Sequence, residues 1–131
     1  MASGSLDKIG NPCLKVRIAG VSSKAASEFD AIIDTGFSGF ISMPLVQAFP
    51  LGLPLHGTTT VTFADGQNQV KLLAGAKVSV GTKTKEEFGL IILEETSTDI
   101  LVGMDFLLTF KLALSRVSWR SDYLMKMRSR R

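Results

Sequence analysis

The triplet Asp34-Thr35-Gly36 is the part of the sequence best suited to chemistry. It follows two apolar β-branched residues, Ile32 and Ile33, so a carboxylate stands where a buried strand is predicted to end. Burying an ionised carboxylate without partners costs several kcal/mol, and the Thr-Gly that follows forces a tight backbone at the same place. The position of Asp34 therefore indicates a function, and the chemistry that a carboxylate offers is proton transfer.

The sequence lacks the residues that other catalytic chemistries require. Ser-His-Asp or Cys-His catalysis would depend on the only histidine, His56, which lies in a Pro/Gly-rich segment with no nucleophile near it in the sequence. A zinc site needs several cysteines and histidines, and the chain has one of each, so we expect neither a metal nor a cofactor. Neither GxxxxGK[ST] nor GxGxxG occurs, so no phosphate-binding loop is predicted.

The elements that must position Asp34 are predicted to be strands. Short runs rich in β-branched residues alternate with glycine, proline and polar segments, which is typical of an all-β chain. Asp65-Gly66 lies between two such runs and predicts a hairpin. The expected strands are residues 13–20, 28–34, 40–43, 58–64, 67–80, 86–95, 100–102 and 111–119, with short helices at 44–49 and 104–110.

Three segments in this order resemble the retropepsin-like aspartic proteases, in particular their small, single-domain, bacterial-type members. The segment IIDTGFSGF (32–40) is similar to the catalytic loop, TFADGQ (62–67) to the flap, and ILVGMDFL (100–107) to the apolar-Gly turn and helix behind the site. The resemblance covers roughly residues 11–119. It implies a closed or partly open β-barrel with one short C-terminal helix, one lobe per chain, and a homodimer.

Aspartic proteolysis requires two carboxylates, and the sequence offers one suitable triplet. One carboxylate takes a proton from a water molecule that attacks the peptide carbonyl, while the other, protonated, polarises the carbonyl oxygen. Two like charges about 3 Å apart cannot both ionise, so the groups titrate as a pair. No other aspartate is followed by Thr-Gly. The simplest solution is a two-fold homodimer in which each chain supplies Asp34, Thr35 bonds across to the partner loop, and Gly36 permits a close backbone approach.

The resemblance also implies the substrate, an extended peptide lying between the flap and the two Asp34 residues. Strand-like pairing supplies affinity, and pockets for alternate side chains supply specificity. We expect contacts from the loop after the triplet, the hairpin tip and the ILV run: Phe37, Ser38, Phe63, Ala64, Asp65, Gly66 and Val102. These residues imply cleavage beside hydrophobic residues, and simple packing of the two phenylalanines is the alternative.

The chain departs from retroviral relatives beside the triplet. Phe37 stands where many of them have a small residue, and Met104 stands where they often have an arginine that pairs with an acid near the catalytic loop. Ser38 is not an acid, so another contact must brace the loop. Two alternatives to an enzyme remain. One is a catalytically silent peptide-binding or dimerisation module of the same fold, and the other is an unrelated β-barrel binding module with Asp34 on a surface turn.

Composition restricts the partners and the location. The net charge is +3, but four basic residues lie in the last six positions, and without them 11 basic residues (15 − 4) face 12 acidic ones. A near-neutral body does not predict nucleic-acid binding. No apolar run reaches the roughly 18 residues of a membrane span, and the N-terminus lacks the apolar segment of a secretory signal. With Cys13 as the only cysteine, no intrachain disulfide can form, and a cytoplasmic location is favoured.

The length of 131 residues is that of one domain with a core of its own. We expect a disordered leader, natural or added, at residues 1–10. The retropepsin-like domain is expected at residues 11–119. Residues 120–131 are expected to form a basic tail.

Overall fold

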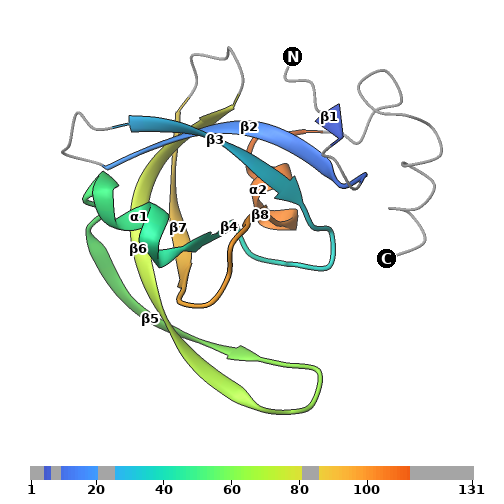
Figure 1. Cartoon of the computed structure of the whole chain (residues 1–131), viewed down its shortest axis with the longest axis vertical. Helices are drawn as coiled ribbons and strands as arrows, with labels where there is room; N and C mark the ends of the chain where they lie inside the picture. The colour runs from blue at the N-terminus through green and yellow to red at the C-terminus, as the bar shows by residue number, and fades with distance from the viewer. Residues whose placement is uncertain (1–4, 7–9, 21–25, 81–85, 113–131) are drawn as a thin grey trace.

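The chain forms an eight-stranded sheet that curls into a barrel (Figure 1). The computed structural model describes residues 5–6, 10–20, 26–80 and 86–112. The strands within these ranges are β1 (Ser5–Leu6), β2 (Pro12–Ala19), β3 (Ala26–Ile33), β4 (Ile41–Pro44), β5 (Leu55–Thr62), β6 (Asn68–Val80), β7 (Glu87–Glu94) and β8 (Ile100–Val102). The helices are α1 (Leu45–Ala48), the 3-10 helix η1 (Phe49–Leu51) and α2 (Met104–Thr109).

Six of the strands close into a ring. The order β2-β3-β8-β4-β7-β6 returns to β2 because residues 16–19 of β2 pair with residues 77–80 of β6. Strand β1 is attached to β2, and β5 is attached to β6, outside this ring. The prediction of an all-β barrel with one short C-terminal helix is therefore confirmed.

The barrel interior is filled by alternate side chains of the strands. In β2, Leu14, Val16 and Ile18 are buried, while Lys15 and Arg17 between them are exposed, as the two-residue period of a strand requires. Helix α2 adds an aromatic cluster to this core. The ring centroid of Phe106 lies 5.3 Å from that of Phe40 and 4.8 Å from that of Phe110. The helix is thereby packed directly behind the segment that joins β3 to β4.

A hairpin made of β5 and β6 extends beyond the barrel (Figure 1). The ladder between β6 and β7 begins at the pair Leu72–Leu93, so the part of β6 before Leu72 has only β5 as a described neighbour. The hairpin predicted at Asp65-Gly66 is present, with Gly66 at a φ of 85°. Asp65 does not have a positive φ, so the turn is not the two-residue type with two left-handed residues. The turn is instead closed by Gly66 N–H donating to Phe63 O at 2.9 Å.

Two segments differ from the expected elements. Strand β5 begins at Leu55, within the predicted Pro/Gly-rich loop, because a bulge between Leu55 and Gly57 keeps this irregular segment in the ladder. Ser5 and Leu6 lie in the segment expected to be disordered and instead pair with β2. The strand expected at residues 111–119 and the basic tail lie outside the described residues from residue 113 onward. No helix in the described part of the chain is long and apolar enough to cross a membrane.

Candidate active site

Asp34 lies at the end of two neighbouring parallel strands. Ile33 of β3 pairs with Val102 of β8, and the N–H of Asp34, one residue further on, donates to Val102 O at 2.9 Å. The carboxylate is held locally, since its Oδ1 accepts the N–H of Gly36 at 2.9 Å. A Cβ atom added at Gly36 would lie 3.3 Å from this oxygen, which is tighter than an ordinary contact. The glycine therefore gives the carboxylate room beside the main chain.

The segment from Asp34 to Phe40, here called the Asp34 loop, is fastened by its main chain to the turn between β8 and α2. Gly103 N–H donates to Phe40 O at 3.0 Å, and Met104 N–H donates to Phe37 O at 2.8 Å. The N–H of Asp105 is shared between two carbonyl oxygens of the loop, Gly39 O at 3.2 Å and Ser38 O at 3.3 Å. The apolar-Gly turn predicted to support the site does so through backbone hydrogen bonds.

Thr35 carries a buried hydroxyl oxygen that has no hydrogen-bond partner among the described residues. The residue as a whole is half-buried, although its hydroxyl oxygen is not exposed. Leaving a buried polar group unpaired costs about 1–3 kcal/mol, and such groups are rare in folded proteins. The hydroxyl therefore calls for a partner from outside the described part of the chain.

Strand pairing assembles a row of side chains on the outer face of the barrel. Ile32 pairs with Leu101, Leu101 with Ser42, Ser42 with Ile92, and Ile92 with Leu73. Paired residues project on the same side of a sheet. The neighbours of these residues in β3, β4, β7 and β8 are buried in the core, as is Ala74 beside Leu73, whereas Leu72 on the other side of Leu73 is exposed. We call this row the outer strip. Its four apolar members are half-buried, whereas Ser42 is buried.

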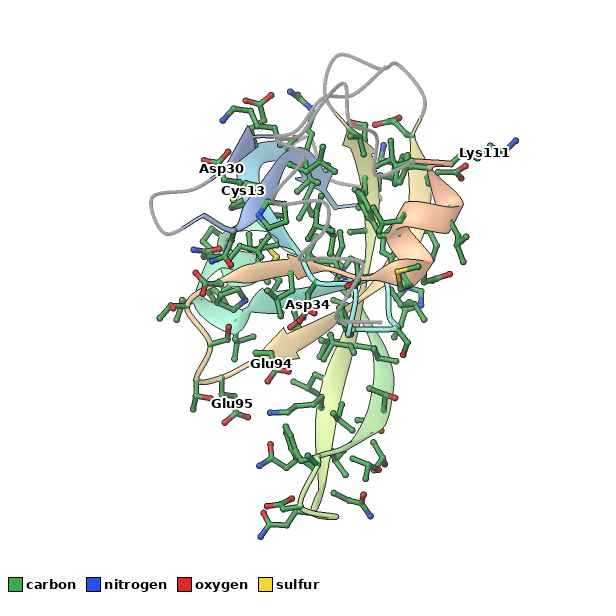
Figure 2. All side chains as sticks on the ribbon, turned by 90° about the vertical axis from the view of Figure 1, so that its right-hand side faces the viewer. Cys13, Asp30, Asp34, Glu94, Glu95 and Lys111 are labelled. Carbon is green, nitrogen blue, oxygen red and sulfur yellow. The ribbon has the colours of Figure 1, made fainter. Side chains whose placement is uncertain are left out.

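The outer strip leads from the Asp34 loop toward the hairpin. Side chains of an extended chain alternate between its two faces. Asp34, two residues after Ile32, therefore begins the loop on the same face as the outer strip. Beyond the strip, a cavity of about 290 Å³ is lined by Leu73, Ile92, Phe88 and Leu90, with Asp105 at its border. At the base of the hairpin, Lys71 Nζ and Glu94 Oε1 form a half-buried ion pair at 2.8 Å. Figure 2 shows Glu94 on the hairpin side of Asp34. This face offers a long, mainly apolar surface beside a carboxylate.

The residues predicted to form the site lie on the Asp34 loop, at the tip of the hairpin and in β8. Asp34, Thr35, Gly36, Phe37 and Ser38 share the Asp34 loop. The four predicted flap residues, Phe63, Ala64, Asp65 and Gly66, are exposed around the tip of the hairpin. The hairpin extends beyond the barrel, and in Figure 1 its far end curves round to lie below the loop that joins β3 to β4.

Val102 does not take the place predicted for it. Its side chain is fully buried in the barrel core, so it contributes its carbonyl oxygen to the Asp34 N–H and offers no surface to a substrate. Leu101, its neighbour, is the member of β8 that faces outward. The prediction treated the apolar run as a unit, although the alternation of a strand assigns adjacent residues to opposite faces. The other apolar members of the outer strip were also missed, because they meet only through strand pairing.

The described residues contain no group of three or more His, Cys, Asp or Glu side chains that could hold a metal ion. What the site offers is a carboxylate on a fixed main chain, an unpaired hydroxyl beside it and an apolar face. A carboxylate can transfer protons or orient water, but it needs a second acidic group to polarise a carbonyl at the same time.

A closed barrel with this loop and this supporting turn is the arrangement expected of a retropepsin-like aspartic protease. Among solved structures, the chain is similar to "EIAV protease complexed with the inhibitor HBY-793", with a TM-score of 0.59 and 13% sequence identity over 85% of this chain and 98% of the other. At this identity the likeness concerns the fold. Residues 16–109 match the family described as "gag-polyprotein putative aspartyl protease", and the chain belongs to that family. No curated protein matches the chain.

Proposed function

We propose that the chain is an aspartic endopeptidase that works as a homodimer, with Asp34 of each chain on either side of the attacking water. The observation that carries this proposal is the Asp34 carboxylate, anchored by Gly36, beside a Thr35 hydroxyl that lacks a partner. On this proposal each chain supplies one carboxyl group of the pair and one hydroxyl that has no partner among the described residues. A two-fold axis next to this loop would supply both missing groups at once.

The proposed reaction follows from the two carboxyl groups. The ionised one accepts a proton from the water, whose oxygen attacks the peptide carbonyl, and the protonated one donates its hydrogen bond to the carbonyl oxygen. A proton is then delivered to the leaving nitrogen, and the C–N bond breaks. The Gly36 N–H keeps the carboxylate oriented throughout.

The substrate proposed for this site is an extended peptide with hydrophobic residues around the cleaved bond. The outer strip supports this choice, because Ile32, Leu101 and Ile92 present half-buried apolar side chains beside the Asp34 loop. Closure of the hairpin over the peptide would bring Phe63 and the turn after it to the substrate and exclude water. Phe63 is exposed in the described chain, so its apolar side chain is available for such a contact.

The test joins oligomeric state to activity. We expect the protein to cleave peptides that carry paired hydrophobic residues, to sediment as a dimer at working concentrations, and to bind a statine-type inhibitor that tightens the dimer. Analytical ultracentrifugation with and without the inhibitor, and mass spectrometry of the digested peptides, give these results. A protein that stays monomeric at high concentration and ignores the inhibitor would instead be a silent module of the same fold.

The rate of cleavage is expected to follow a bell-shaped pH profile on the acidic side of neutral. At low pH the carboxyl pair holds two protons and has no base, and at high pH it holds none and has no acid, so the rate falls on both sides. Initial rates should be measured alongside far-ultraviolet circular dichroism at each pH, which separates loss of the proton from loss of the fold. A flat profile between about pH 4 and 9 contradicts a pair that shares one proton.

A further inference from the structure

We propose that Phe37 is a positioning residue for Asp34, because its ring is packed against Gly39 and Gly103 and fixes the Asp34 loop to the turn after β8. This inference rests on the proposed function, since a position for Asp34 matters through the reaction. It also changes the role of Phe37, which the sequence predicted as a contact for the substrate.

The ring of Phe37 occupies the space that a side chain would need at two glycines. A Cβ atom added at Gly39 would lie 2.7 Å from both Cε1 and Cζ of the ring, and one added at Gly103 would lie 2.7 Å from Cδ2. Both distances are shorter than real side chains tolerate. The two glycines therefore contact different edges of one ring, one from within the Asp34 loop and one from the turn behind it.

The two glycines are required for different reasons. The φ of Gly39 is not in the left-handed region, and the ring of Phe37 supplies all the close contacts that its added Cβ would meet. At Gly103 an added Cβ would also collide with the main-chain oxygens of Gly39 and Phe37. A side chain at position 39 is thus excluded by the ring, whereas one at position 103 is excluded by the backbone as well.

The ring is coupled to the carboxylate through a short stretch of main chain. Phe37 N–H donates to Asp34 O at 3.1 Å, and Phe37 O accepts the N–H of Met104 at 2.8 Å. The loop is consequently braced by an apolar ring and by backbone hydrogen bonds.

A carboxylate that must share a proton with its symmetry mate tolerates little displacement, since misplacement by about 1 Å can cost roughly a hundredfold in rate. Phe37→Ala should therefore lower kcat by about tenfold or more and leave KM within about a factor of two. Gly39→Ala should lower kcat similarly, because its methyl group would push the ring aside.

The decisive experiment is a pair of double-mutant cycles. In a Phe37→Ala background, adding Gly39→Ala should cause little further loss of kcat or of thermal stability, because the ring that excludes the methyl group is gone. Gly103→Ala is the matched control, and its cost should persist in the same background because the carbonyl oxygens remain. Equal costs of Gly39→Ala in both backgrounds would overturn the proposal.

Two further readouts separate this role from others. A rise in KM at unchanged kcat in Phe37→Ala would make the ring a wall of the substrate site and would refute a positioning role. The Gly36 amide proton, which is bonded to Asp34 Oδ1, reports on the carboxylate without any substrate. Its protection from hydrogen exchange should fall in Phe37→Ala, and unchanged protection contradicts the inference. If the parent protein cleaves nothing, the proposed function has failed, but this exchange rate and the stability cycles still decide the role of the ring.

Discussion

Asp34→Asn should abolish peptide cleavage, by roughly a thousandfold or more, while the barrel and the dimer stay intact. Asparagine has nearly the same shape, and its side-chain oxygen can still accept the Gly36 N–H that now reaches Asp34 Oδ1. What is lost is the ability to exchange a proton with water, and both halves of the proposed pair lose it together. Cleavage rates, circular dichroism and sedimentation of the variant against the parent give the three quantities required.

Mixed dimers make this prediction specific to a shared site. When Asp34→Asn chains are combined with parent chains and allowed to exchange, dimers with one asparagine should be inactive. Activity should then fall as the square of the parent fraction, because only dimers of two parent chains have both carboxyl groups. A linear fall would mean that each chain carries a complete site of its own. A variant that cleaves as well as the parent would exclude the mechanism.

Thr35→Val should weaken the dimer without weakening the fold of the chain. The unpaired Thr35 hydroxyl destabilises the isolated chain, so its replacement by a methyl group should leave the thermal stability of the dilute monomer unchanged or higher. In the dimer, the two-fold axis doubles the loss to two hydrogen bonds, about 1–3 kcal/mol in total. The dimer dissociation constant should therefore rise roughly tenfold to a hundredfold. Sedimentation equilibrium over a concentration series measures it.

Thr35→Ser is the matched control, because it keeps the hydroxyl and removes only a methyl group. It should retain most of the dimer affinity of the parent. If Thr35→Val destabilises the monomer and leaves dimerisation unchanged, the hydroxyl bonds within its own chain and the argument from its missing partner fails. Activity at high protein concentration should recover in Thr35→Val, since mass action restores the dimer.

Much of the fold could be predicted because its features are local. Asp65-Gly66 identified the hairpin, and the apolar-Gly segment before α2 identified the turn behind Asp34, since each depends on a few adjacent residues. The start of β5 was missed because a bulge between Leu55 and Gly57 accommodates a segment whose composition is typical of a loop. The strand at Ser5–Leu6 was missed because two residues carry too short a pattern to predict pairing.

The candidate site likewise has one part that local sequence predicts and another part that depends on the order of the strands. Asp34, Thr35 and Gly36 could be found from their own sequence, whereas the outer strip depends on β4 lying between β8 and β7, an order that no local pattern encodes. The prediction named Val102 as a substrate contact in place of Leu101 for a related reason, because only the register of β8 decides which of the two neighbours faces outward. The contact of Phe37 with Gly39 and Gly103 joins two segments distant in sequence, so it required the structure.

The closure of the barrel between β2 and β6 has a consequence for when the protein becomes active. Val16 pairs with Val80 and Ala19 with Lys77, so the ring joins residues that are far apart in the chain. Barrels built from such distant pairs fold slowly, in milliseconds to seconds, because a long loop must be ordered before its contacts form. A growing chain on the ribosome cannot complete this ring until β8, the last of its strands along the chain, has emerged. The proposed protease would therefore be synthesised in a silent form, and its first cleavage would have to wait until two chains had each closed their barrels and met.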